Sequence, residues 1–210
     1  MIHAEGQTAA IRMPVVACLL LAVCLVSAGT ARARQAPPPD RPTSFSRLHL
    51  GGAASLDIEQ WGASEWDQRG AARIQAATPL GLGVLEAGVL GLAYDSRDNQ
   101  LPDWTAFFVH AGWRATWHAH THLILGAGLR AGNLLMLFDD KDLVAGQRRE
   151  SEFSLEPHIR ADIRVSRRVA LFMEGGFLRT FTEPRIDIVQ TSAGLVLDLR
   201  MPTWLRSAIE

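Results

Sequence analysis

The chain lacks the features that mark many enzymes and nucleic-acid-binding proteins. No glycine-rich phosphate loop, dinucleotide-binding fingerprint or EF-hand occurs in its 210 residues. The formal net charge of -1 excludes the strongly basic balance of a nucleic-acid-binding domain. Its longest apolar run is shorter than the roughly 20 residues that a membrane-spanning helix needs. We therefore expect one domain of ordinary size, with no cofactor and no nucleic-acid partner.

Cysteine is scarce and confined to one place. Cys18 and Cys24 lie within the apolar run 14–28, which follows Arg12 and precedes the triplet ARA at 31–33. A basic start, a short apolar middle and an A-x-A ending are typical of a secretory signal peptide, which we predict at residues 1–33. Its cleavage would leave no thiol for a disulfide or a thiolate metal site. An uncleaved anchor and a lipid attached to Cys18 are the alternatives.

Helical periodicity is also absent after the proline-rich residues 34–44, which we predict to be an extended tether. The stretch EFSLEPHIRADIRV, Glu152 to Val165, instead places apolar residues at odd positions and polar residues at even ones. This period of two is typical of a β-strand with one apolar face and one polar face. Similar segments recur along the chain, at 47–58, 70–78, 82–94, 104–117, 122–135, 152–165, 169–181 and 187–200.

The links between these segments alternate in length. Short links follow the second, fourth and sixth segments, and long links (59–69, 95–103 and 136–151) follow the first, third and fifth. An even number of strands with short turns on one rim and long loops on the other is typical of transmembrane β-barrels. A tilted strand of about 9 to 11 residues crosses the hydrocarbon layer. We predict an all-β fold, an eight-stranded antiparallel up-and-down transmembrane β-barrel, over residues 45–200.

Alternation alone does not say which face is outside, since a soluble barrel would enclose its apolar face around a ligand. The polar face carries charges of both signs beside glycines, which suits a narrow interior where the charges pair. Aromatic residues on the apolar face gather toward both rims, as in interfacial girdles. We therefore predict an interior polar network of Arg114, Arg130, Glu152, Glu156, His158, Arg160, Asp162, Arg164 and Glu174.

The last segment, SAGLVLDL at 192–199, resembles the C-terminal assembly signal of small eight-stranded outer-membrane β-barrel proteins of Gram-negative bacteria. The matching residues are one polar residue, one glycine and two apolar residues at alternating places, namely Ser192, Gly194, Leu197 and Leu199. The resemblance implies a bacterial outer-membrane location, contact with outer-membrane lipid and recognition by the barrel-assembly machinery. Family members usually stop at an aromatic residue that ends the last strand. Here residues 201–210 follow, and we predict that they form a C-terminal periplasmic extension.

Two local patterns conflict with regular strands. Pro157 removes one ladder hydrogen bond in mid-strand, where we predict a β-bulge. The alternation of residues 186–188 disagrees with the segment that follows, which predicts a register slip near the last loop.

Candidate chemistry is weak. His118, His120 and His122 have side chains that bind zinc, copper or nickel, yet no carboxylate or cysteine lies close in sequence. Ser154, Glu156 and His158 have the residue types of a hydrolase triad, but their shared parity directs them into the lumen, away from lipid. We therefore predict no metal and no catalytic residue.

The predicted function follows from the size of the barrel. Eight strands enclose an interior just wide enough for side chains, so we expect a plugged polar lumen rather than a channel. The role would then be structural, or a surface interaction through the long loops, and the protein would be a monomer. A lipid-A-modifying enzyme on the same scaffold and a soluble periplasmic barrel that binds an apolar ligand are the alternatives.

Overall fold

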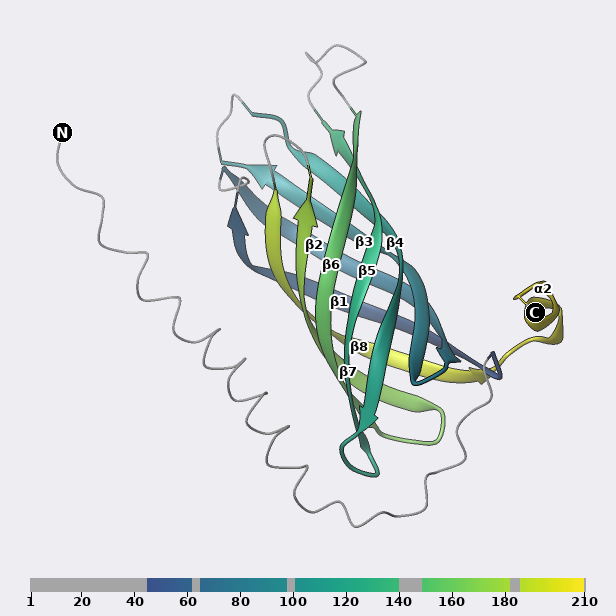
Figure 1. Ribbon diagram of the computed structural model, residues 1–210. Helices are drawn as coiled ribbons and strands as arrows, with labels where there is room; N and C mark the ends of the chain where they lie inside the picture. The colour runs from purple at the N-terminus through teal and green to yellow at the C-terminus, as the bar shows by residue number, and fades with distance from the viewer. Residues whose placement is uncertain (1–44, 62–64, 98–100, 140–148, 182–185, 210) are drawn as a thin grey trace. The chain divides into compact units, whose positions relative to one another are not determined.

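The computed structural model describes residues 45–61, 65–97, 101–139, 149–181 and 186–209. The predicted signal peptide and tether, residues 1–44, lie outside the described residues, as does most of the link after the fifth predicted segment. The described chain forms a barrel of long strands followed by a short helix (Figure 1).

The strands closely follow the predicted segments. They are β1 (Arg47–Trp61), β2 (Trp66–Leu80), β3 (Gly83–Ser96), β4 (Trp104–His118), β5 (Leu123–Phe138), β6 (Arg149–Arg164), β7 (Val169–Thr180) and β8 (Asp187–Arg200). Each strand pairs antiparallel with the next, and β8 returns to pair with β1, so the sheet closes. The predicted eight-stranded up-and-down barrel is confirmed.

The strands are longer than the sequence pattern predicts at the end that carries the longer connections. β1 continues to Trp61 and β2 begins at Trp66, so most of the predicted long loop 59–69 is strand. β5 and β6, of 16 residues each, likewise extend into the predicted loop 136–151. The extra residues exceed the roughly 9 to 11 that cross a bilayer. Backbone hydrogen bonds between strands can continue where the strands enter water. A strand in water does not need alternating apolar residues, so the sequence pattern does not reveal it there.

Pro157 interrupts the pairing without a bulge, so the predicted bulge is wrong. The β5–β6 register runs unbroken through Leu129 and Pro157. The β6–β7 pairing skips Glu156 and Pro157 and resumes at His158 with Gly176, in the register that it had before. The missing N–H of Pro157 therefore faces β7, and the two strands separate locally without an inserted residue.

The predicted register slip near the last loop occurs on one side of β8 only, in its pairing with β1 opposite Val189 and Gln190. The β7–β8 pairing runs without a shift from Asp187 onward. The irregularity lies in the neighbouring strand, where β1 shifts register between Asp57 and Glu59. Ile188 lies on the same strand face as Gln190 and points into the lumen. Its apolar side chain fits there because this end of the lumen is apolar. The alternation of residues 186–188 looks irregular because an apolar side chain occupies an interior position.

The lumen contains two layers of side chains. At the end with the longer connections lies an apolar core in which Tyr94 and Trp104 stack with ring centroids 4.2 Å apart. The middle of the lumen and the part nearer the short turns hold a buried layer of charged and polar residues. The apolar layer consists of Leu90, Leu92, Tyr94, Trp104, Ala106, Phe108, Leu134, Met136, Leu178 and Ile188.

The short turns and the C-terminal segment complete the structure. Gly81 adopts a φ of 62° in the tight β2–β3 turn, a left-handed conformation that glycine tolerates without strain. After Pro202 the chain forms helix α2 (Thr203–Ile209), whose Trp204 is 71% exposed. Within the described ranges, no helix is long and apolar enough to span a membrane.

Candidate functional site

Arg130 is the centre of the buried polar layer. This β5 side chain is completely buried, and its Nη1 and Nη2 each donate to Glu174 at 2.7 Å. Its Nε donates to Glu86 at 2.9 Å, and Nη1 also donates to Glu156 at 3.1 Å. Nη2 reaches the amide oxygen of Gln75 at 3.2 Å. One guanidinium group therefore connects four other strands of the barrel.

A second arginine holds the same carboxylates from the opposite side of the lumen. Arg73 of β2 donates to both oxygens of Glu156, at 2.9 and 2.5 Å, and forms an ion pair with Glu174 at 3.5 Å. Gln190 of β8 donates to Glu156 at 2.9 Å. Glu156 thus lies between two guanidinium groups, and Glu174 meets a third as well, that of Arg160 at 3.6 Å, which is the pairing that a buried carboxylate requires.

A third group lies nearer the short turns. Arg160 donates to Asp162 from Nε and Nη2, at 3.0 and 2.7 Å, and its guanidinium lies 3.6 Å from the ring centroid of Phe172. Arg114 forms ion pairs of 3.4 Å with both Asp162 and Glu86. His158 contacts Glu86 at 3.0 Å. These contacts join the third group to the Arg130 cluster through Glu86, and the ion pair of Arg160 with Glu174 at 3.6 Å joins them a second time.

The buried charges balance. Four guanidinium groups, those of Arg73, Arg114, Arg130 and Arg160, meet four carboxylates, those of Glu86, Glu156, Glu174 and Asp162. A buried network is tolerated when its members satisfy one another, and removal of one partner leaves an uncompensated charge in a medium of low dielectric. The layer therefore fixes the strands relative to one another and fills the lumen at the same time.

Most of the predicted interior residues meet in this layer, and two do not. Arg114, Arg130, Glu156, His158, Arg160, Asp162 and Glu174 are buried there. Glu152 is only half-buried and Arg164 is exposed, because they lie near opposite ends of β6 and outside the filled part of the lumen.

The prediction omitted several members of the network that lie on the other strands. Arg73, Gln75, Glu86 and Gln190 are all buried at interior parity. Glu86 is the one charge in an otherwise apolar β3 core, and a single ionised residue in such a strand is itself a signal of an interior partner. Arg73 and Gln75 carry a weaker signal, since their segment alternates poorly in sequence.

Interior glycines make room for the arginines. A Cβ at Gly126 would lie 2.7 Å from Nη1 of Arg114. A Cβ at Gly112 would lie 2.9 Å from Cα and 3.0 Å from Cγ of Arg130. At Gly126 the side chain of Arg114 leaves no room for a Cβ, whereas at Gly112 the obstacle is the β5 backbone, with the carbonyl oxygen of Leu129 closest to the Cβ position.

The exterior is apolar at the same height. Val109 and Leu129 are each 49% exposed and Met173 is 66% exposed, on strands whose interior positions carry the charges. Trp113 and Trp117 are exposed toward the short turns, and Phe153 and Phe181 toward the other rim. A membrane-spanning barrel has this arrangement, with an apolar exterior, ionised residues inside and aromatic residues at both rims.

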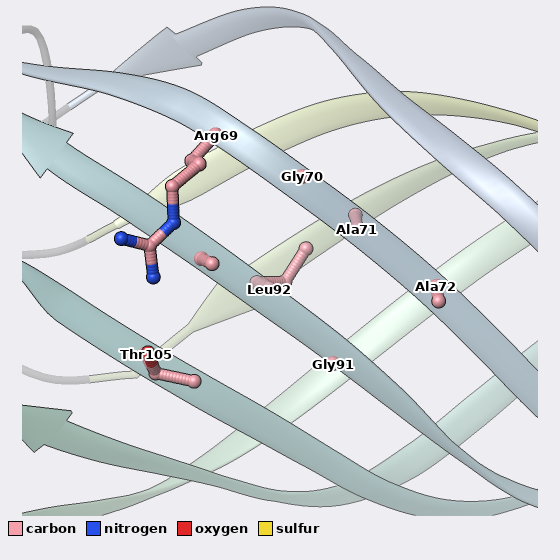
Figure 2. Close-up of a pocket in the computed structure, with 8 residues that line it drawn as sticks. Arg69, Gly70, Ala71, Ala72, Gly91, Leu92 and Thr105 are labelled. Carbon is pink, nitrogen blue, oxygen red and sulfur yellow. The ribbon is translucent and has the colours of Figure 1, made fainter.

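A recess of about 410 Å³ interrupts this apolar exterior near the rim with the longer connections (Figure 2). Small residues of three neighbouring strands line it, including Gly70, Ala72, Gly91 and Thr105. Arg69 of β2 reaches over it and forms an ion pair with Asp95 at 3.2 Å.

The rim beside the recess is tied together by polar contacts. Trp66 donates from its indole nitrogen to the carbonyl oxygen of Pro102 at 2.8 Å, and the hydroxyl of Tyr94 donates to Asp57. Arg97 donates to Asp67 at 2.5 Å, and this hydrogen bond raises the pKa of Arg97 above its ordinary value. These contacts join β1, β2 and β3 to the β3–β4 connection at this rim.

The candidate reactive residues do not form a site. His118, His120 and His122 lie at the β4–β5 turn, where the rings of His120 and His122 are 6.4 Å apart. Among the described residues, no group of three potential ligands is placed to hold a metal ion. The Oγ of Ser154 donates to the carbonyl oxygen of Glu152 at 3.3 Å, and His158 lies against Glu86 inside the lumen.

The predicted assembly signal has clear structural positions. The hydroxyl groups of Ser192 and Ser55 lie 2.6 Å apart inside the barrel. A Cβ on Gly194 would lie 2.7 Å from Cα of Ala53, so β8 packs closely against β1 there. Leu197 and Leu199 face outward. The motif thus alternates between the closing seam and the lipid-facing surface.

Comparisons with known proteins give a structural likeness alone. No family model matches the chain, and no curated protein sequence matches it significantly. Neisserial surface protein A is similar in structure, with a TM-score of 0.54 and 11% identity, covering 73% of this chain and 97% of its own. The attachment invasion locus protein Ail of Yersinia pestis, in complex with the heparin analogue sucrose octasulfate, has a TM-score of 0.50 and 9% identity, covering 74% and 99%.

The outer-membrane protein OprG of Pseudomonas aeruginosa also has a TM-score of 0.50, with 11% identity, covering 75% of this chain and 97% of its own. The predicted location in a bacterial outer membrane agrees with these neighbours and with the apolar exterior of the barrel. The chain therefore has the fold of the small eight-stranded outer-membrane β-barrel proteins, as its sequence predicts.

Proposed function

We propose that this protein is a closed, monomeric outer-membrane scaffold with a structural or surface-interaction role, and that it does not conduct solutes. The observation that carries the proposal is the filled lumen, in which a balanced ionic layer lies in series with an apolar core. A passing solute would have to separate buried ion pairs and then displace the packed aromatic residues. Separating a buried pair costs about 3 to 5 kcal/mol when one partner is left uncompensated.

The charge of the outer rim limits the class of partner. Among the described residues at this end, carboxylates outnumber guanidinium groups, with Glu65, Asp67, Asp95, Asp103, Asp139, Glu150, Glu152 and Asp187 against Arg69, Arg97, Arg149 and Arg179. Ail was solved with a heparin analogue, which is a polyanion. The rim of this chain has the opposite preference, so the proposed surface partner is neutral or cationic rather than a sulfated polysaccharide.

Assembly and oligomeric state belong to the same proposal. The exposed apolar positions of β8 and its glycine at the closing seam support recognition of the last strand by the barrel-assembly machinery. A closed sheet leaves no free strand edge to pair with another chain, which supports a monomer. No observation favours the enzyme alternative. The soluble-binder alternative requires an apolar lumen at mid-height, where Arg130 and Glu156 lie.

Conductance across a planar lipid bilayer tests the closed lumen. The folded protein, identified by different gel migration of unboiled and boiled samples, should insert without current steps. A porin added to the same membrane should give steps and so verify detection. Reproducible steps that depend on this protein would contradict the proposal.

A further inference from the structure

The rim with the short turns carries a cluster of exposed arginines. Arg167 and Arg168 form the β6–β7 turn, Arg164 ends β6 and Arg200 ends β8, and all four side chains are exposed. We call these four residues the basic arc. The hairpin turns of this rim gather at one end of the barrel in Figure 1.

Backbone hydrogen bonds make the basic arc continuous. The amide of Arg164 donates to the carbonyl oxygen of His122 at 2.8 Å, which joins the β4–β5 and β6–β7 turns. The amide of Asp198 donates to the carbonyl oxygen of Arg168 at 2.8 Å, which joins that turn to β8. The arc therefore follows one side of the barrel from β6 to β8.

Little negative charge opposes it. The described carboxylate at this rim is Asp198, which already accepts from Arg47 at 2.8 Å and lies 3.8 Å from His49. The side chains of Arg164, Arg167, Arg168 and Arg200 form no ion pair with any residue that the structure describes. In the lumen, by contrast, each arginine meets a carboxylate. The arc is thus left with uncompensated cations at a membrane boundary.

Exposed apolar side chains lie next in sequence to these cations, although Arg164 and Arg200 share the interior parity of Asp162 and Asp198. Ile163 and Val165, which flank Arg164, are 52% and 63% exposed. Leu171, Leu197 and Leu199 continue the exposed apolar surface on β7 and β8. On the other side of the barrel, the β2–β3 turn at Gly81 and Leu82 carries no ionisable group. Exposed cations and exposed apolar side chains therefore occur at the same rim, on the strands β6 to β8.

We propose that the basic arc binds anionic glycerophospholipid headgroups in the leaflet that faces the short turns. A guanidinium group donates in a planar fork that matches phosphate oxygens, and arginines beside a bilayer attract anionic lipid. The adjoining leucine and isoleucine side chains would contact the acyl chains of the same molecule. This continuity distinguishes a lipid from a soluble polyanion, which would contact the arginines alone. The inference does not depend on the proposed surface partner.

Native mass spectrometry of the folded protein in mixed micelles with equal phosphatidylglycerol and phosphatidylcholine tests the proposal. The unsubstituted protein should retain phosphatidylglycerol preferentially. The triple variant R164Q/R167Q/R168Q should lose about tenfold or more of that preference, since each juxtamembrane cation contributes. The matched control R69Q/R97Q/R149Q removes three exposed arginines from the opposite rim and should retain it. The gel shift on boiling verifies that each variant is folded.

Three results would overturn the assignment. The first is equal retention of the two lipids by the unsubstituted protein. The second is an equal loss of preference in the control variant. The third is binding of heparin or inorganic phosphate that is as tight as phosphatidylglycerol binding and equally sensitive to R164Q/R167Q/R168Q, which would make the arc a general anion site.

Discussion

Arg130 contacts three carboxylates and one amide while being fully buried, so its substitution affects more partners than any surface arginine would. Arg130→Met keeps most of the side-chain volume but leaves Glu174 and Glu86 short of a counter-charge. We expect the free energy of unfolding to fall by about 3 to 5 kcal/mol, as for other broken buried ion pairs. Equilibrium urea unfolding in lipid vesicles measures this change.

The exposed Arg149, at the rim of β6, is the matched control. Arg149→Met should leave the unfolding midpoint unchanged, since its side chain makes no buried contact. The double variant Arg130→Met/Glu174→Gln should recover part of the loss, because it also removes one unpaired carboxylate. Equal effects of Arg130→Met and Arg149→Met would show that the network contributes no stability.

Interior glycines give a steric prediction. A Cβ on Gly132 would lie 2.8 Å from Cα of His110 on the neighbouring strand, whereas a Cβ on Gly70 would meet no atom within 4 Å. Gly132→Ala should therefore lower the free energy of unfolding by about 1 to 3 kcal/mol, the usual cost of overpacking. Gly70→Ala should be neutral or slightly stabilising in the same urea titration. A neutral Gly132→Ala would mean that β4 and β5 separate there without cost.

For individual residues, the sequence predicted which face of a strand carries the charges, but it did not predict which side chains contact one another. Parity placed Glu156 and Arg130 inside the barrel, yet the contact of Arg73 with Glu156 joins residues 83 positions apart. Such a contact depends on the tilt and register of strands on opposite sides of the lumen. A one-dimensional pattern does not contain that information.

Among the elements, β6 carries the most informative irregularity. Its pairing with β7 lapses at Glu156 and Pro157, while its pairing with β5 continues. Pro157→Ala restores an N–H that faces β7, and one further ladder hydrogen bond should stabilise the barrel by about 0.5 to 1.5 kcal/mol. Hydrogen exchange should show slower exchange for the amides around Gly176 and Phe177 of β7. Faster exchange, or a lower unfolding midpoint, would show that the local opening is required for packing around Glu156.

The centres of the strands could be predicted and their ends could not. Apolar alternation marks the part of a strand that faces lipid, and it stops where the strand enters water. The ladder of β1 nevertheless continues to Trp61, because backbone hydrogen bonds need no particular side chain. Helix α2 has only seven residues, too few for a periodic signal, and it was not predicted.

For the whole molecule, the division of the lumen into an ionic and an apolar layer was only half predicted. The sequence indicated a polar interior, whereas Leu90 and Leu92 of β3 lie inside the barrel and form part of the apolar layer. At the end with the longer connections, the buried interior side chains are mostly apolar. Ile188 faces inward for the same reason, because it lies in this apolar layer.

Site-directed spin labelling tests the inside-out arrangement most directly, since the barrel residues 45–210 contain no cysteine. Single cysteines at Val109, Leu129 and Met173, labelled in lipid vesicles, should collide often with dissolved oxygen and rarely with a water-soluble nickel chelate. A label at Glu65, on the exposed rim, should show the reverse. High nickel accessibility at the three mid-strand sites would place these side chains in water and contradict a lipid-facing exterior around an ionised core.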